Sequence, residues 1–225
     1  MRRSPRGISA VLVLVLVSTG VALPARTAEA SRHVVSIAHA RTLPPGTVVT
    51  VAGTATTPSG AFESSFFDRG FAIQDRTAGI YVSVPADPHV TPRDKVRVTG
   101  TLRDSYGLLV LVPADPAEVH VRGKGPEVRP VPLATGAVGE ATEGLLARVT
   151  ATVTRAPASD LPYGHKFFVD DGSGELTIFV NTGTGIDLTG LAVGRTVRVT
   201  GFSSQFDTHY EIDPRSPDDI VVRRP

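Results

Sequence analysis

The chain has 225 residues, of which 23 are basic and 22 are acidic, giving a formal net charge of +1. It contains no cysteine, which excludes disulfide staples and thiolate chemistry. This length suits one large domain or two small ones, and the near-neutral charge does not favour a strongly basic nucleic-acid-binding protein.

Residues 1–30 have the pattern of a secretory signal peptide. A basic start precedes an apolar stretch with VLVLVLV at its centre, and an A-x-A sequence ends at Ala30. A membrane anchor is the alternative, but the apolar stretch is short for a span of about 20 residues. We expect cleavage near Ala30 and a secreted mature chain that is not held in the membrane. Removal of four arginines and one glutamate changes the net charge from +1 to −2.

The mature sequence is rich in Val, Thr, Gly and Pro. Short β-branched runs alternate with turn signals, which indicates small sheets or barrels rather than helices. In chain order, the strand candidates of the first half are 47–56, 70–74, 79–84, 95–102, 108–112 and 118–121.

The second half repeats the first in the same order. The pentapeptide VRVTG occurs at 96–100 and again at 197–201. Four further blocks match: 46–57 with 144–155, 71–75 with 167–171, 80–84 with 176–180, and 116–121 with 217–222. Because the blocks keep their order and their apolar phase, we predict two homologous modules of about 90 residues, each large enough for a small core.

We predict a first domain over 31–123, a linker over 124–143 and a second domain over 144–225. Gly and Pro mark the start of the linker, and its proline run makes it semi-rigid. Each module contributes five antiparallel strands joined by short turns, which predicts an all-β fold of two tandem five-stranded Greek-key barrels. Gly53 lies inside the first long strand, where a glycine often marks a bend or a bulge.

The order of these strands, with the motifs F-x-[IV]-x-D and V-x-V-x-G, resembles the OB-fold. It is similar to bacterial exported OB-fold modules that are found alone, in tandem, or appended to secreted nucleases and phosphoesterases. The stretches that carry the resemblance are GTVVTVAGTA (46–55), FAIQDRTAGIYV (71–82) and RDKVRVTG (93–100). The second copy has Asp170 where the first has Gln74. The resemblance implies the fold more than the function, because one fold hosts many functions.

An OB-fold usually binds ligands across the outer face of its second and third strands, flanked by loops. Alternation places Tyr81 on this face in the first copy, and Phe168 and Phe179 on it in the second, as diagonal neighbours. Aromatic rings on that face suit stacking on bases or sugars. Alternatively, the phenylalanine pair packs against the linker or the other domain, since an exposed aromatic patch often marks a protein interface.

Loops supply the remaining candidates. Tyr163, His165 and Lys166 precede Phe168 and form with it a mixed aromatic and cationic cluster. Tyr106 and Phe206, in the loops between the fourth and fifth strands, are also predicted to bind ligand. Arg97 and Arg198, which have the same position in the two VRVTG sequences and should face outward on the fourth strand, complete the set. For the arginines a solvated barrel wall is the simpler interpretation, so we expect a modest salt-dependent phosphate contribution.

Phe62, Phe66 and Phe67 lie together in the loop between the first two strands of the first copy. They could form a lid over the sheet or plug the end of the barrel. The plug is the favoured interpretation, because a small barrel needs an apolar cap.

The sequence contains no catalytic or metal-binding signature. G-x-S-x-G, H-E-x-x-H and P-loop motifs are absent, and the six histidines are spread out without ligand spacing. The stretch DDGSGE (170–175) is too short for an EF-hand and is better explained as a hairpin turn. We therefore predict a monomeric binding protein that needs no cofactor and has no catalytic residues.

The favoured ligand is single-stranded nucleic acid or an oligosaccharide outside the cell, bound mainly by the second copy. The alternative is a protein-interaction module that serves an exported nuclease or phosphoesterase. A hydrolase with an unrecognised site is a third hypothesis, but no acid, base and nucleophile converge in the sequence to support it.

Overall fold

The computed structural model describes residues 33–223, so the predicted signal peptide lies outside the described residues. The first half contains β1 (Val34–Val35), α1 (Ile37–Arg41), β2 (Val48–Ala55), β3 (Phe71–Gln74), β4 (Gly79–Val82), β5 (Asp94–Ser105), β6 (Leu108–Val112), the 3₁₀ turn η1 (Pro116–Glu118) and β7 (Val119–Lys124). The second half contains β8 (Val131–Pro132), η2 (Thr135–Ala137), η3 (Glu140–Thr142), β9 (Leu146–Asp160), β10 (Gly164–Asp170), β11 (Leu176–Asn181), η4 (Thr182–Thr184), β12 (Thr196–Phe206), β13 (His209–Asp213), η5 (Pro217–Asp219) and β14 (Ile220–Val222).

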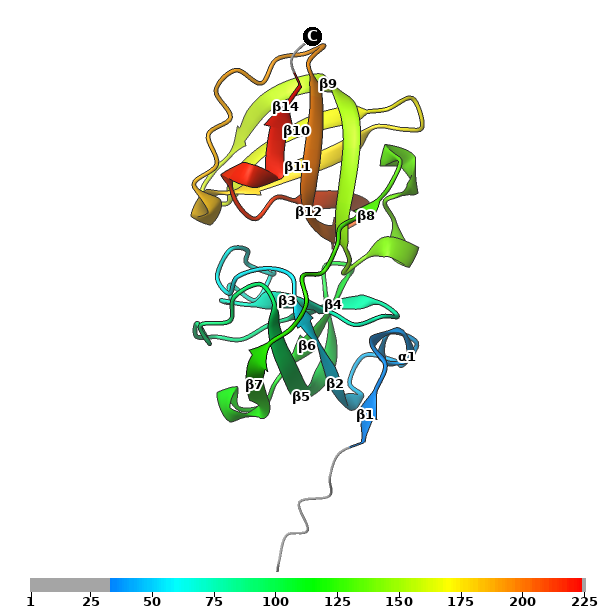
Figure 1. The fold of residues 1–225 in the computed structure, drawn as a ribbon, viewed down its shortest axis with the longest axis vertical. Coiled ribbons are helices and arrows are strands. Elements are labelled where there is room, and N and C mark those ends of the chain that lie inside the picture. Colours follow the sequence, from blue (N-terminus) through cyan, green and yellow to red (C-terminus); the bar gives the residue numbers. More distant parts are fainter. Residues whose placement is uncertain (1–32, 224–225) are drawn as a thin grey trace, which may run out of the picture. The chain divides into compact units, whose positions relative to one another are not determined.

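Each half forms a closed five-stranded barrel, coloured blue to green for the first and green to red for the second (Figure 1). The first sheet has the order β1-β2-β3-β4-β6-β5-β7, and β2 pairs with β5 to close the ring. The second has the order β14-β12-β13-β11-β10-β9-β8, and β9 pairs with β12. The pairs β4–β6 and β11–β13 are parallel. This confirms the predicted all-β class of two tandem OB-fold-like barrels. The prediction that all the strands are antiparallel is wrong for these two pairs, because their strands are not consecutive in the chain.

Some elements extend beyond their predicted limits. β5 continues to Ser105, past the predicted end at Leu102, because its last residues pair with β6. β9 runs to Asp160 because it forms a long hairpin with β10. The segment 124–143, predicted as a linker, contains β8, η2 and η3, and β8 pairs in parallel with β9.

Alternation along the strands predicts the two cores correctly. The inward-facing side chains of β3 and β4 in the first barrel, and of β10 and β11 in the second, are at most 3% exposed. They are Phe71, Ile73, Ile80 and Val82, and Phe167, Val169, Leu176, Ile178 and Val180. Each barrel therefore encloses its own apolar core.

The apolar cap of the first barrel is α1. Its residues Ile37 and Ala40 are fully buried in the barrel core. The loop phenylalanines have other places: Phe62 packs on the outside of the sheet, and Phe66 and Phe67 are exposed. The prediction that they plug the barrel end is therefore wrong, because α1 already fills that space.

Three glycines occupy positions where the backbone does not favour a side chain. Gly46 and Gly144 precede the first long strand of each barrel with φ of 92° and 85°, a left-handed conformation that favours glycine. At Gly53 an added Cβ would lie 2.9 Å from the carbonyl oxygen of Gln74. The special backbone predicted at Gly53 is therefore a close approach of β2 to β3.

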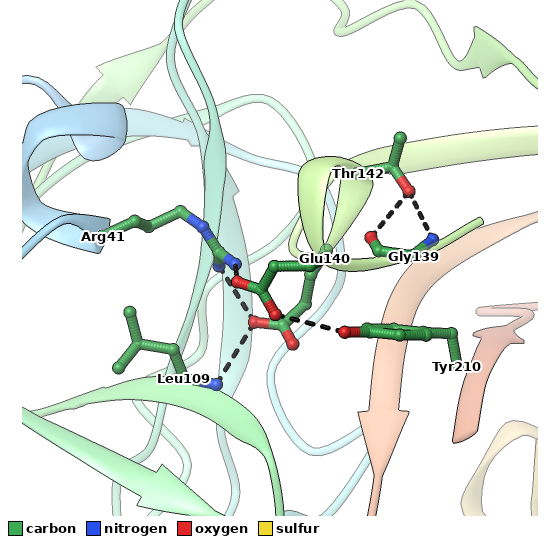
Figure 2. A network of polar contacts seen from close by, with 7 residues as sticks. Arg41, Leu109, Gly139, Glu140, Thr142 and Tyr210 are labelled. Atoms are coloured by element: carbon green, nitrogen blue, oxygen red, sulfur yellow. Dashed lines mark hydrogen bonds and ion pairs between the residues drawn. The ribbon is translucent and has the colours of Figure 1, made fainter. Parts of the chain in front are cut away.

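The two barrels contact each other through a polar network that includes Arg41, Leu109 and Glu140 (Figure 2), and the hydrogen bonds of Arg41 and Leu109 meet at Glu143. Arg41 of α1 donates to Oε1 of Glu143 and to Oε1 of Glu140, both at 3.0 Å. The backbone N–H of Leu109 donates to the same oxygen of Glu143 at 3.2 Å, and Tyr210 Oη donates to Glu140 at 3.2 Å. Because the Glu143 side chain is only 1% exposed, Arg41 is its main compensating charge.

Backbone contacts complete this interface. The N–H of Leu146 donates to Oε1 of Gln74 at 3.0 Å. Gly79 and Gly144 lie so close together that a Cβ added to Gly79 would be 1.9 Å from the carbonyl oxygen of Gly144. The barrels therefore touch without any side chain between them at this point.

Candidate functional site

The outer face of β3 and β4 in the first barrel is covered. Tyr81, predicted to be exposed there, is only 1% exposed because Phe62 and Phe202 pack over this face. The ring centroids of Tyr81 and Phe202 are 5.8 Å apart, and those of Phe62 and Phe202 are 6.1 Å apart. The predicted direction of Tyr81 is right, but its predicted exposure is wrong, since a loop and the second barrel cover the surface. Tyr81 is therefore inaccessible to a ligand.

Polar contacts stabilise the loop that packs over this face of the first barrel. Buried Asp68 accepts a hydrogen bond from Tyr81 Oη at 2.8 Å, and further hydrogen bonds from Ser83 Oγ and Ser64 Oγ. Burial raises the pKa of Tyr81 well above its ordinary value, and the charge of Asp68 acts in the same direction. Tyr81 is therefore a neutral donor that anchors the loop carrying Asp68.

Tyr81→Phe is expected to lower the free energy of unfolding by about 1–3 kcal/mol, because Asp68 loses a donor in a buried site. Equilibrium urea unfolding measures the change. Tyr163→Phe is the matched control, since the Tyr163 side chain is 53% exposed. Equal stability of the two variants would show that the Tyr81–Asp68 hydrogen bond does not stabilise the packing of this loop on the barrel.

The outer face of β10 and β11 in the second barrel is open. Lys166 pairs directly with Phe179, so Phe168 and Phe179 are diagonal neighbours as predicted, and both are partly exposed. The guanidinium carbon of Arg155 lies 3.4 Å from the centroid of the Phe168 ring, a cation–π contact. Arg155 is also paired with Glu175, so this cation is already neutralised.

The cluster predicted around the β9–β10 hairpin is only partly assembled. Lys166 and Phe168 share the outer face, whereas His165 lies on the core-facing side of β10. Tyr163 is exposed in the hairpin loop. His165 is separated from Lys166 because β10 already begins at Gly164, so that alternation applies to both residues.

The predicted loop residues Tyr106 and Phe206 lie against each other, although they belong to different barrels. Their ring centroids are 5.6 Å apart, with 28° between the ring planes. His209 contacts Phe206 edge-on, with centroids 6.0 Å apart. The side chains of Tyr106 and Phe206 are 61% and 51% exposed. We call Tyr106, Phe206 and His209 the aromatic ledge.

Two tight turns build the aromatic ledge. Tyr106 and Gly107 alone join β5 to β6, with φ of 51° and 92°, as a type I′ hairpin requires. Asp207 begins the equivalent turn at φ 55°, and its N–H donates to the carbonyl of Tyr106 at 2.7 Å. Gly107 also forms an isolated antiparallel bridge with Phe206. A tyrosine at positive φ is uncommon, and such strain often accompanies function.

Titratable groups of the second barrel border the aromatic ledge. His209 Nε2 lies 3.5 Å from Oε2 of Glu211, and hydrogen bonding to Glu211 raises the pKa of His209. The charge of Lys166 opposes that shift. The ledge therefore has mixed charges rather than a basic surrounding.

Arg97 and Arg198 lie on different walls of the barrels from the aromatic residues. Arg97 of β5 pairs with Ala52 of β2, and Arg198 of β12 pairs with Thr150 of β9. Both side chains are partly exposed. The structure therefore does not bring these two predicted residues to the outer face of β10 and β11.

Sequence reasoning did not identify His209 as a member of the aromatic ledge. His209 shares its strand face with Glu211, a pattern that indicates no more than exposed surface. The loop of Phe66 and Phe67 is tied to the β5–β6 hairpin, because Ser65 Oγ and Ser105 Oγ lie 2.7 Å apart. No local pattern in the sequence signals that the two hairpin turns meet.

Within residues 33–223, no group of three or more histidines and carboxylates could hold a metal ion. No helix in the described part of the chain is long and apolar enough to span a membrane.

No protein-family model matches the chain. Endonuclease YhcR of Bacillus subtilis (strain 168) is 27% identical over 161 residues, which cover 67% of this chain and 13% of that protein. The chain therefore matches only a small part of the length of this relative.

The chain is also similar, at low sequence identity, to several solved structures. A murine DNA-binding protein bound with double-stranded DNA has a TM-score of 0.39 and 11% identity, over 78% of this chain and 97% of that chain. The tetrameric p202 HIN2 structure has a TM-score of 0.37 and 16% identity, over 80% and 94%. The hypothetical protein ygiW from E. coli has a TM-score of 0.32 and 20% identity, over 41% and 92%.

Proposed function

We propose that this protein is an exported, monomeric, non-catalytic protein that binds single-stranded nucleic acid through the aromatic ledge. The observation that carries the proposal is the exposed stack of Tyr106 on Phe206, built by the two hairpin turns that join the last barrel strands. In an OB-fold, loops in this position flank the ligand site. Each ring presents a π-face, and a stacked base contributes about 1–3 kcal/mol.

A single strand is favoured over a duplex. Bases can stack on side chains only when they are splayed out of their own helix. Phe168 and Phe179 add a second aromatic position on the outer face of the same barrel, with Lys166 between them as a cation. These side chains match the stacking platforms of proteins that bind single strands without sequence preference.

Charge near the aromatic ledge favours stacking over phosphate binding. Lys166 pairs with Asp160 at 3.3 Å, and Arg155 is paired with Glu175. The affinity of a single strand falls with salt in proportion to the number of phosphates contacted. We therefore expect binding at the ledge to depend weakly on ionic strength.

The non-catalytic part of the proposal rests on the sequence, which lacks the motifs of common hydrolases and metalloenzymes. Export rests on the signal-like residues 1–30. Endonuclease YhcR is named for cleavage, but the similarity spans 13% of that protein. We propose that this stretch supplies binding rather than cleavage.

Tyr106→Ala and Phe206→Ala are each expected to weaken binding of a fluorescent mixed-sequence oligonucleotide about tenfold, because each variant removes one stacking face. Fluorescence anisotropy of residues 31–225, at low and at physiological salt, measures the affinity. Val193→Ala is the control, because Val193 is exposed and is not part of the ledge. Phe168→Ala tests the second aromatic position separately.

Three outcomes would count against the proposal. Absence of binding at low salt would exclude the nucleic-acid ligand. Unchanged affinity of both ledge variants would place the site elsewhere. Tighter binding of an oligosaccharide than of the oligonucleotide would assign the same aromatic rings to sugar stacking.

A second candidate function is an accessory module for an exported nuclease, which the similarity to part of an endonuclease favours. In this case the outer face of β10 and β11 would dock a protein. Sedimentation velocity of the mature chain mixed with a purified exported nuclease tests this directly. Complex formation that Phe179→Ala abolishes, without oligonucleotide binding, would favour this function.

A further inference from the structure

A basic groove lies along the walls formed by β5 and β12 and contains no ledge residue. Two adjoining pockets, of about 350 Å³ and 640 Å³, are both lined by Glu127 and Val128. The smaller pocket is lined by both barrels, with Arg93 from the first and Arg148 and Arg198 from the second. The larger pocket is lined by the first barrel and the segment after β7. We call the two pockets together the arginine groove.

Basic side chains outnumber acidic ones in the arginine groove by eight to four. One of each is used internally, because Arg215 donates to both oxygens of Asp219 at 2.8 Å and to the carbonyl of Thr56 at 2.7 Å. Asp75 is also engaged, since it accepts the backbone N–H of Ile37 at 2.9 Å. With the Arg215–Asp219 pair set aside, basic side chains still outnumber acidic ones in the lining of the groove.

Two of the arginines are positioned by the protein itself. Arg93 Nε donates to the carbonyl of Gly125 at 3.2 Å, and Arg148 Nε donates to Oγ1 of Thr200 at 3.0 Å. Arg93 also has a φ of 76°, which is uncommon for a residue other than glycine. A guanidinium anchored through Nε retains two terminal nitrogens that match the oxygens of a phosphate.

The duplication places one equivalent arginine in each pocket. Arg97 and Arg198 have the same position in the two VRVTG sequences. Arg97 lines the larger pocket and Arg198 lines the smaller one. Cations that recur along two joined pockets suit an extended chain of anions better than one small anion.

We propose that the arginine groove is a second nucleic-acid site, which binds the sugar-phosphate backbone regardless of base. The inference deepens the proposed function and rests on it for the class of ligand. The shared chemistry is a chain of phosphate oxyanions, which inorganic polyphosphate also offers. The test therefore separates backbone from bases, and nucleic acid from polyphosphate.

The probe is a fluorescent abasic deoxyribose-phosphate strand, which keeps the phosphates but has no base to stack. Arg148→Gln/Arg198→Gln in the mature chain is expected to weaken its binding at least tenfold at low salt. The slope of log K against log salt should become shallower by about 1.4, because each of the two arginines that no longer neutralises a phosphate removes about 0.7 from it. Arg103→Gln is the matched control, because Arg103 is exposed on β5 and does not line the groove. Phe206→Ala should bind the abasic strand normally.

Several results would overturn the proposal. The abasic strand could fail to bind at low salt, or the double variant could bind it as tightly as the wild type. Tighter binding of inorganic polyphosphate than of an abasic strand of equal phosphate number would exclude nucleic acid as the ligand. Arg198→Gln alone, checked by thermal unfolding, separates loss of charge from misfolding, since Arg148 also bonds within the fold.

The two proposals fail in different ways. If normal oligonucleotides bind through the ledge while the abasic strand does not bind, the proposed function stands and the groove is not a site. If the abasic strand binds through the groove while both ledge variants keep full affinity for oligonucleotides, the groove stands and the ledge fails.

Discussion

Gly79→Ala is expected to lower the free energy of unfolding by about 3 kcal/mol, at the upper end of the usual cost of overpacking. An alanine Cβ here would lie 1.9 Å from the carbonyl oxygen of Gly144 and 2.4 Å from its carbonyl carbon. Both atoms belong to the backbone, so no side-chain rotation can relieve the contact. The start of β4 and the segment before β9 would have to separate, which would also strain the hydrogen bond from Leu146 to Gln74.

Urea unfolding at equilibrium measures this effect. Gly139→Ala is the matched control, because Gly139 lies in the same connecting segment as Gly144, has extended backbone at φ −176°, and has nothing within 4 Å of an added Cβ. We expect the control to unfold close to the wild type. Equal midpoints for the two alanine variants would contradict the direct backbone contact between the barrels.

The barrels themselves could be predicted from local signals. Period-two alternation identifies the buried side of β3, β4, β10 and β11 in both copies. Glycines such as Gly46 and Gly144 mark the start of the first long strand, because that turn needs a positive φ. These signals lie within a few residues of the structure they specify, so they persist in both copies.

The covered face of the first barrel could not be predicted in this way. Alternation correctly places Tyr81 on the outside of its strand, but it does not report what packs against that outside. Phe62 comes from a loop and Phe202 comes from the other barrel, and both cover Tyr81. Only the long-range docking of the two copies decides which outer face remains open.

The same limit applies to charge. Arg93, Arg148 and Arg198 are far apart in the sequence, and the predicted mature chain has a net charge of −2. The composition therefore favours weak phosphate binding. Folding brings these arginines around one pocket beside the segment that joins the barrels. A local excess of charge, rather than the net charge, is what a phosphate chain would encounter.

The two barrels use the corresponding face differently. In the first barrel this face carries Tyr81 and contacts the second barrel, while in the second barrel it carries Phe168 and Phe179 and remains open. The first barrel therefore contributes Tyr106 to the aromatic ledge. The second barrel contributes Phe206 and the open outer face of β10 and β11. This division explains why the aromatic ledge needs both barrels in contact.

The contact between the barrels includes the buried ion pair of Arg41 and Glu143. Because Arg41→Met leaves the carboxylate of Glu143 without its cation, this variant is expected to destabilise the protein by about 3–5 kcal/mol at pH 8. Arg41 is the cation beside a carboxylate that is 1% exposed, whose Oε2 has no hydrogen-bond partner among the described residues. The second ion pair of Arg41, with Glu140, contributes little because the Glu140 side chain is 71% exposed.

The cost of Arg41→Met should grow with pH. Burial raises the pKa of Glu143, while the charge of Arg41 opposes the shift. In the unfolded chain a glutamate has a pKa of about 4.3. Because the pKa of Glu143 is higher in the folded protein than in the unfolded chain, the contribution of Glu143 to the free energy of unfolding is greatest below its unfolded pKa. This contribution declines as the pH rises through the folded pKa. Without Arg41 the folded pKa rises further, so this decline is larger and continues to higher pH.

Urea unfolding of wild type and Arg41→Met between pH 4 and pH 8 tests this dependence. The difference in stability should be small near pH 4, where Glu143 is protonated in the folded variant, and largest at pH 8. In a Glu143→Gln background the same arginine substitution should cost much less and should not vary with pH, because no buried charge remains to be compensated. A difference that is constant across the range would mean that Arg41 acts through packing alone.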